Sequence, residues 1–170
     1  MIIKKVNITE IEDVMSIISD AIKLLGKTSL QWQQGYPNEE VMKIDISNGY
    51  CYGAFDKNHL IGIITLKKGI DENYIDIDGN WSIPLSDNDL QIHRIAVKED
   101  YHGKKIGDLL IKFAIKKAKE DNCTSIKVDT HRVNYPMQHI LINNQFSYAG
   151  IITLKKDEID NTRLAYELKI

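Results

Sequence analysis

The stretch from Leu90 to Glu120 runs from a strand pattern into a helix pattern, and this junction constrains the fold more than any other feature. "LQIHRIAV" (90–97) reads as a strand, and "YHGKKIGDLLIKFAIKKAKE" (101–120) repeats apolar residues at helical spacing. The helix begins beside Gly103, Lys104 and Lys105, with no obvious side-chain cap. Such a helix end presents free amides and a partial positive charge, which suits a phosphate group.

Two glycines and two lysines do not by themselves establish a phosphate site. Glycine is an acceptable cap, and lysines in a turn are commonly solvated. The chain also lacks the GxxxxGK[ST] of a P-loop and the GxGxxG of a dinucleotide fold. An ordinary strand–helix turn and a phosphate site therefore both remain open on these residues alone.

The remaining elements give the order βααβββαβαββ, a mixed α/β pattern. The first helix is expected to start from a capping box of Thr9 and Glu12 and to stop at Gly26. Asn38 is expected to cap a short helix that runs to about Ser47. Residues 134–136, Asn-Tyr-Pro, are expected to start another helix, since proline is tolerated in a first turn. The other strands are expected at residues 1–8, 50–55, 60–68, 74–77, 125–130, 146–152 and 163–170, the second and third of them as a hairpin.

Composition bounds the class of protein. The chain has 170 residues with 43% hydrophobic residues, so we expect a single domain spanning 1–170. A net charge of -2 argues against general nucleic-acid binding. No stretch approaches the ~20 apolar residues of a membrane span. Two isolated cysteines, Cys51 and Cys123, fit a reducing cytoplasm, and no histidine pair has zinc-like spacing, so no metal is expected.

Two segments together resemble the GNAT superfamily of N-acetyltransferases. "HRIAVKEDYHGKKIGDLLIKFAI" resembles the family's central strand, its [Q/R]-x-x-G-x-[G/A] loop and its helix, although His102 and Lys105 depart from the marker positions. "NYPMQHILINNQFSYAGI" resembles the second motif, with Gln145 where the family has glycine. The resemblance implies a central, mostly antiparallel sheet that is splayed at its middle and flanked by helices.

The same resemblance implies acetyl-CoA as co-substrate. Its pyrophosphate would bind the backbone amides at the start of the helix, provided that Lys105 has a helical φ, and its pantetheine arm would pair with the preceding strand end as an extra strand would. Asn134 matches the family's asparagine beside the cofactor. The cofactor-binding residues implied are Ile95, Ala96, Val97, His102, Gly103, Lys104, Lys105, Ile106, Gly107, Asp108 and Asn134.

Acetyl transfer to an amine needs proton acceptors and a way to release the thiolate. His93, on the strand just before the cofactor-binding end, is the first candidate base, and we expect it and Arg94 to point to opposite faces. A packed strand histidine is the alternative. His131, with Asp129 as an orienting partner, is a second candidate. The tyrosine that the family often uses as the acid is replaced by Leu141, which leaves the general acid unassigned.

The acceptor is less constrained. Trp32 and Tyr36, in the loop over residues 30–37, lie where the family builds its acceptor wall and are candidates for substrate binding, or they pack the loop onto the core. Residues 70–89 carry six acidic residues and no basic one, which would favour a cationic amine if they lie near the acceptor. An aminoglycoside, a polyamine, an amino acid and a peptide N-terminus all fit.

Three functions stay open at this stage. The first is an acetyl-CoA-dependent N-acetyltransferase acting on a primary amine by direct transfer. The second is a non-catalytic acyl-CoA-binding or sensing module on the same fold. The third, an interaction domain without the cofactor site, is suggested by His102, Lys105 and Gln145 at marker positions. Edge strands in such folds often pair, so a homodimer is compatible with each of them.

Overall fold

The computed structural model describes residues 1–26, 31–32, 34–155 and 159–170. Its helices are α1 (Ile11–Leu25), α2 (Glu39–Ser47), α3 (Ile106–Glu120) and α4 (Tyr135–Asn143). Its strands are β1 (Ile2–Lys5), β2 (Cys51–Asp56), β3 (His59–Lys68), β4 (Ile77–Gly79), β5 (Asp89–Val97), β6 (Ser125–Thr130), β7 (Ser147–Thr153) and β8 (Thr162–Lys169).

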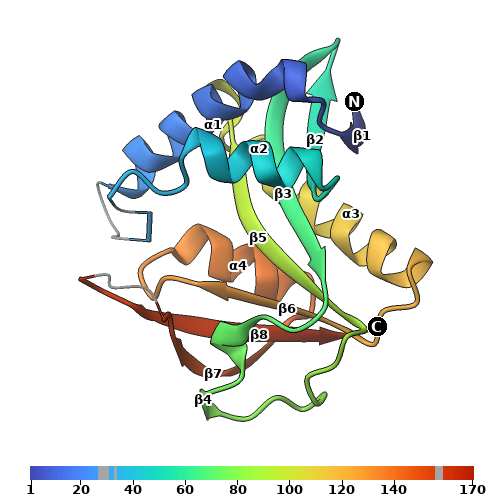
Figure 1. The fold of residues 1–170 in the computed structure, drawn as a ribbon, viewed down its shortest axis with the longest axis vertical. Helices are drawn as coiled ribbons and strands as arrows, with labels where there is room; N and C mark the ends of the chain where they lie inside the picture. The colour runs from blue at the N-terminus through green and yellow to red at the C-terminus, as the bar shows by residue number, and fades with distance from the viewer. Residues whose placement is uncertain (27–30, 33, 156–158) are drawn as a thin grey trace.

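The described strands form one sheet in the order β1-β2-β3-β5-β6-β8-β7-β4. Every neighbouring pair is antiparallel except β5 and β6, which are parallel. The β5–β6 pairing ends at Ile92↔Val128, although β5 continues to Val97 and β6 to Thr130. Figure 1 shows the two strands starting together near the C-terminus and then diverging, so the sheet splays at its middle.

Three buried apolar clusters hold this sheet. One packs α3 and α4 against the strands through fully buried residues such as Leu110, Ile111 and Leu141. A second packs α1 and α2 against β2 and β3, and includes Val14 and Met42. The third is small and joins Tyr74, Trp81, Ile152 and Ala165. Residues 72–81 therefore cover part of β7 and β8, on one side of the splay. The α1–α2 layer covers part of β2 and β3, on the other side.

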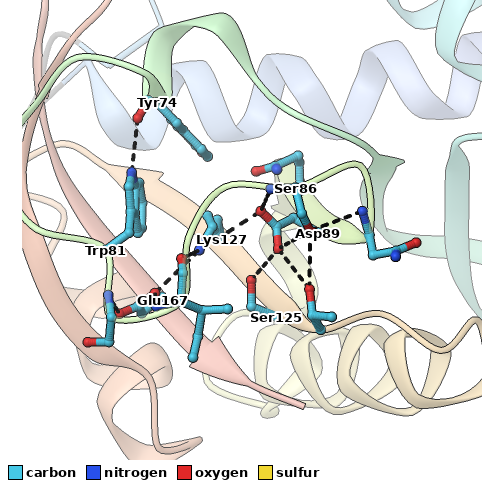
Figure 2. Close-up of polar contacts among 12 residues, drawn as sticks. Tyr74, Trp81, Ser86, Asp89, Ser125, Lys127 and Glu167 are labelled. Atoms are coloured by element: carbon cyan, nitrogen blue, oxygen red, sulfur yellow. Dashed lines mark hydrogen bonds and ion pairs between the residues drawn. The ribbon is translucent and has the colours of Figure 1, made fainter.

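A buried ion cluster, defined by Lys127, Glu167 and Asp89, fixes the segment that leads into β5. Lys127 Nζ lies 3.3 Å from Glu167 Oε2 and 4.0 Å from Asp89 Oδ2, and it donates a hydrogen bond to the carbonyl of Ile83 at 2.9 Å. Glu167 also accepts a hydrogen bond from the Ser82 amide at 2.6 Å. Figure 2 shows these contacts tying residues 81–89 to β6 and β8. Residues 80–89 are thus held to the sheet.

The mixed, mostly antiparallel sheet flanked by helices confirms the fold class expected from the sequence. Two local predictions were wrong. The capping box uses Asn7 and Glu10, because a 3-10 turn (Ile8–Glu10) precedes α1, rather than Thr9 and Glu12. The short strand is Ile77–Gly79, since Tyr74 lies in a separate 3-10 turn. The loop expected over residues 30–37 lies partly outside the described residues.

Candidate active site

The start of α3 is uncapped, as its sequence predicts. Lys105 is the residue before the helix and provides no side-chain cap. The first intrahelical bond is from the amide of Leu109 to the carbonyl of Lys105. Among the described residues, nothing accepts a hydrogen bond from the amides of Ile106, Gly107 or Asp108. These amides form an unsatisfied donor set at the positive end of the helix.

Lys105 does not have the helical φ that the sequence analysis required. Its φ is 61° and its ψ is 21°, which is the left-handed region. Gly103, two residues earlier, also has a positive φ of 77°. The chain turns sharply here to pass from β5 into α3, so the position where the family pattern has glycine keeps a glycine-like conformation in this chain. The cost falls on the backbone of Lys105, while the amides beyond it have no acceptor among the described residues.

Other residues predicted to bind the cofactor lie around the same turn. His102 Nε2 lies 2.9 Å from the carbonyl of Val97. Asp108 accepts hydrogen bonds from Asn144 and Lys112, and these bonds hold the pKa of its carboxyl below the ordinary value. A methyl group at Gly107 would approach Ile140 Cδ1 to 3.0 Å. The Asp108 carboxylate is thus occupied within the protein, and its backbone amide is the group left for a ligand.

The end of β5 offers an unpaired edge next to this turn. Ala96 and Val97 pair with Ile63 and Gly62 of β3 on one side. On the other side, no described strand pairs with β5 beyond Ile92. An extended chain can therefore add to this edge by backbone hydrogen bonds. The predicted pantetheine contacts at Ile95, Ala96 and Val97 fall on it.

A cavity of about 290 Å³ opens at the splay. It reaches from the α1–α2 layer across β5 and β6 to the segment after β3. The described residues that line it are Leu25, Gln31, Trp32, Tyr36, Lys67, Asp71, Asn73, Ile92, His93, Arg94, Ile95, Val128, Asp129, Asn134, Met137, Leu154 and Arg163. The structure thus brings together His93, Ile95, Asn134, Trp32 and Tyr36 from the residues named in the sequence.

His93 and Arg94 both line this cavity, so the expectation that they face opposite ways was wrong. The cause is a bulge. The register between β3 and β5 shifts between Ile63 and Thr65, and Arg94 has a φ of 43°. A bulge of this kind interrupts the regular alternation of side chains and re-aims one of them. Two polar side chains in sequence can therefore serve the same site.

His93 is enclosed by charges. Its Nε2 lies 3.3 Å from Asp71 Oδ2. Burial lowers the pKa of His93 to about 4, and the nearby Arg94 and Lys67 act in the same direction against the attraction of Asp71. The imidazole is therefore neutral at pH 7. If Nε2 donates to Asp71, Nδ1 is the nitrogen that can accept a proton.

Arg94 connects the α1–α2 layer to the cavity. Its guanidinium makes a bidentate contact with buried Asp45, at 2.6 Å and 3.1 Å, and donates to the Tyr36 hydroxyl at 2.5 Å. Lys67 Nζ lies 3.1 Å from Asp45 as well. Although burial acts to raise it, the pKa of Asp45 is held below its ordinary value by Arg94. Sequence reasoning missed this contact. The sequence holds one sign of this contact, since Asp45 lies on the same face of α2 as the apolar Met42.

Asp129 lies at the opposite side of the splay from Arg94. The buried Tyr74 hydroxyl donates to Asp129 Oδ1 at 2.7 Å. Burial raises the pKa of Asp129, and the hydrogen bond from Tyr74 opposes this shift. The sequence indicates Asp129 only as a partner of His131, because nothing local in it places Tyr74 beside Asp129.

His131 does not have the partner expected for it. Its Nε2 lies 2.9 Å from Asp160 Oδ2, and its Nδ1 accepts a hydrogen bond from the amide of Val133 at 3.3 Å. It is buried and is not among the described residues that line the cavity. Both ring nitrogens are thus engaged away from the site. The pairing with Asp129 was wrong, because Asp129 turns toward Tyr74.

The described part of α4 brings no tyrosine to the cavity as a general acid. Leu141 is fully buried in the apolar cluster, and Tyr135 is 69% exposed. Neither lines the cavity. Tyr36 is the one tyrosine among the described lining residues, and burial raises the pKa of its phenol, so it stays protonated at neutral pH.

The acidic run over residues 70–89 does not gather at the cavity as a whole. Of its six acidic residues, Asp71 is the one among the described lining residues. Asp89 is fully buried and accepts hydrogen bonds from Ser86 and Ser125. The condition for a cationic preference, six carboxylates near the acceptor, is therefore not met in the described residues, since the segment folds back over the sheet.

No group of three or more His, Cys, Asp or Glu residues in the described part of the chain is placed to hold a metal ion. None of the helices described is both long and apolar enough to span a bilayer.

Comparison with known proteins identifies the class. Residues 18–141 match the model of the acetyltransferase (GNAT) family, which is most of the chain. The chain therefore belongs to the GNAT acetyltransferase family. A search of curated proteins finds no significant match.

Solved structures agree with this membership. A GNAT-family acetyltransferase from Streptococcus agalactiae is 31% identical with a TM-score of 0.90, covering 99% of this chain and 95% of that one. The PaiA N-acetyltransferase of Thermoplasma acidophilum, in complex with coenzyme A, is 22% identical with a TM-score of 0.69 over 99% and 98% of the two chains. YncA of Salmonella typhimurium with acetyl-CoA is 12% identical with a TM-score of 0.73, covering 99% and 93%.

Proposed function

We propose that this protein transfers the acetyl group of acetyl-CoA directly to a primary amine within a ternary complex. One observation carries the proposal. The free edge of β5 begins at the cavity, with Ile95, and runs to the uncapped start of α3. An extended thioester arm anchored by its phosphates at the helix would therefore deliver its acyl end into the cavity.

The residues proposed for the cofactor follow from this path. The pyrophosphate is placed on the amides from Gly103 to Asp108, with Lys104 and Lys105 adding positive charge. The pantetheine arm is placed along Ile95–Val97, with Asn134, which caps α4, beside the thioester. His102, now bonded to the Val97 carbonyl, lies at the turn between these two regions. Backbone amides near the splay would polarise the thioester carbonyl.

His93, Trp32 and Tyr36 are proposed to meet the acceptor. All three line the cavity, and Tyr36 is held by Arg94. His93 is neutral at pH 7 and is proposed as a proton acceptor in the transfer.

A second candidate function is a non-catalytic acyl-CoA-binding module. The position of Leu141 favours it, since that side chain is packed in the core and no described tyrosine of α4 reaches the cavity. Acetylation assays against a broad amine panel separate the two functions. Binding of acetyl-CoA without acetylation of any amine would favour the module.

The first test is the melting temperature with acetyl-CoA, free CoA or ATP. A ligand at 100 times its Kd stabilises the folded chain by about 2.7 kcal/mol. For a chain of this size each kcal/mol moves the midpoint by about 2–4 °C, so a rise of about 5–11 °C is expected with both forms of CoA. A chain that melts at the same temperature in all three ligands would refute the proposed cofactor site.

A further inference from the structure

We propose that Asp129 binds the ammonium group of the acceptor and takes its first proton, and that Tyr74 positions Asp129 for this step. The inference rests on the proposed acetyl transfer and adds to it a catalytic carboxylate and its support. Asp129 is the catalytic residue here, because it would touch the acceptor. Tyr74 acts through Asp129.

The sheet places Asp129 at the point of divergence. The last pair between the parallel strands is Ile92↔Val128, so His93 and Asp129 are the next residue on each strand. Side chains alternate along a strand, and paired residues of neighbouring strands share a face, so these two side chains start from the same face of the sheet. Both line the cavity. A thioester reaching the cavity along β5 would arrive between them.

The carboxylate of Asp129 is fixed at one oxygen and available at the other. Oδ1 accepts the hydrogen bond from Tyr74 at 2.7 Å. In the described part of the chain, no other side chain donates a hydrogen bond to Oδ2. A carboxylate oriented in this way into a cavity can accept a hydrogen bond from a bound ammonium group.

Tyr74 is itself rigidly held. It is fully buried, its carbonyl accepts a hydrogen bond from Trp81 Nε1 at 2.9 Å, and the two rings lie 5.5 Å apart. Lys127 Nζ lies 4.6 Å from the centre of the Trp81 ring. Figure 2 shows Tyr74 bonded to Trp81, which stands beside the buried ion cluster. The cluster therefore supports the hydroxyl that orients Asp129.

The surroundings suit a proton acceptor. Besides Tyr74, the charged or titratable groups that act on Asp129 are Arg163, Asp71 and Tyr36. His93, Arg94 and Lys67 line the same cavity. Burial raises the pKa of Asp129, with Asp71 adding to the rise and with Tyr74 and Arg163 opposing it. His93 is less suited to hold a cationic group, because burial lowers its pKa, and Arg94 and Lys67, which lie beside it, act in the same direction.

The proton steps balance as follows. A lysine-like ammonium is only about one part in 2,500 neutral at pH 7, a cost of about 4.6 kcal/mol. Asp129 Oδ2 takes one proton from R–NH₃⁺, leaving R–NH₂. The nitrogen lone pair then forms a bond to the thioester carbon, the C–S bond breaks, and its electron pair leaves with the CoA sulfur. The second nitrogen proton goes to His93, and solvent protonates the thiolate. The products are the N-acetyl amine, CoA and one released proton.

The test compares Asp129→Asn with Asp78→Asn, a matched control that removes the same charge from an exposed residue outside the cavity. Lysine amide, spermidine, kanamycin and a peptide with a free N-terminus serve as acceptors. For an acceptor that the wild type acetylates, Asp129→Asn should lower kcat/KM by about 10²–10⁴-fold, the usual range for a lost general base. Asp78→Asn should stay within about 3-fold of the wild type, and acetyl-CoA should raise the melting temperature equally in all variants.

Tyr74→Phe tests the positioning role through the pH dependence of kcat/KM, which a purely structural role of Tyr74 would not change. Loss of its hydrogen bond removes an interaction that favours the charged carboxylate, so the pKa of Asp129 rises. The acid limb of the kcat/KM–pH profile should then move to higher pH, by about 0.5–1 unit for one hydrogen bond. An acid limb that stays in place in a folded Tyr74→Phe variant would overturn the positioning role.

The outcomes separate this inference from the function on which it rests. A wild-type enzyme that acetylates an amine while Asp129→Asn keeps wild-type kcat/KM overturns the inference and leaves the proposed function intact. A wild-type protein that acetylates no amine in the panel overturns both. A loss of kcat/KM in Asp129→Asn with intact acetyl-CoA binding supports the inference.

Discussion

Replacement of Lys127 by methionine tests the buried ion cluster. The Lys127 side chain is 0% exposed, and its ammonium lies between Glu167 and Asp89 while bonded to the carbonyl of Ile83. Methionine has a similar length and no charge. Lys127→Met therefore leaves two buried carboxylates without their cation, although Glu167 keeps its hydrogen bond from the Ser82 amide. Removing one partner of a buried ion pair costs about 3–5 kcal/mol.

The cost is measured by thermal unfolding against a matched surface variant. For a chain of this size, a loss of about 3–5 kcal/mol lowers the melting temperature by roughly 6–20 °C. Lys116→Met makes the same chemical change on a side chain that is 75% exposed and pairs with Glu120 at 3.7 Å. An exposed pair of this kind contributes about 0.3–0.5 kcal/mol, so the control should melt within ~2 °C of the wild type.

The combined variant Lys127→Met with Glu167→Gln identifies the cause. If the destabilisation comes mainly from a buried charge without its partner, the double variant loses less stability than the two single variants lose together, because Lys127 and Glu167 are in contact. The reasoning is refuted if Lys127→Met melts no lower than Lys116→Met. Strict additivity in the double variant would also contradict it, since the loss would then come from packing alone.

Three other predictions concern the cofactor, the rate and acid stability. Gly107→Glu should weaken acetyl-CoA binding, because it brings negative charge to the α3 amides. Gly107→Ala should bind acetyl-CoA nearly normally, because the added methyl group only displaces the flexible end of Ile140. Equal affinities of the two variants by calorimetry would contradict the placement of the pyrophosphate at these amides. His93→Ala should lower kcat by ~10²-fold or more with little change in acetyl-CoA affinity, and a full rate across pH 6–9 would remove His93 from the mechanism. Burial acts to raise the pKa of Glu167, but hydrogen bonds from the Ser82 and Ile83 amides hold it below its ordinary value of 4.5. The charged Glu167 therefore stabilises the folded chain fully above pH 4.5, and this stabilisation is lost as the pH falls through the lower pKa of the folded state. Glu167→Gln should therefore show a shallower fall of melting temperature in acid, and an unchanged slope would show that Glu167 is not responsible.

The sequence predicts the backbone of the candidate site better than its side-chain contacts. The strand–helix junction could be predicted because its signals are local: an apolar run, two glycines, and helical spacing of apolar residues in α3. The free β5 edge follows from the family resemblance. The left-handed conformation of Lys105 was not foreseen, since a lysine at that position shows no sign of a glycine-like φ.

The contacts that shape the cavity could not be predicted because they join residues far apart in the chain. Arg94 and Asp45 are 49 positions apart, and Tyr74 and Asp129 are 55 positions apart. Each pair depends on how a connecting segment folds back over the sheet, and composition does not determine that path. The acidic run illustrates this point, since the sequence shows its charge but not that Asp89 turns inward while Asp71 turns to the cavity.

Arg94 shows how the splay and the acceptor side of the cavity depend on one another. Its positive φ, which belongs to the bulge in β5, costs about 1–3 kcal/mol for a residue other than glycine. The bidentate contact with Asp45 offsets this cost, and Asp45 in turn would be an unpaired buried carboxylate without Arg94 and Lys67. The bulge therefore locks α2 to β5 where the strands diverge, and it does so with the guanidinium that holds Tyr36. The packing of the α1–α2 layer and the geometry proposed for acceptor binding are then set by the same three charged side chains.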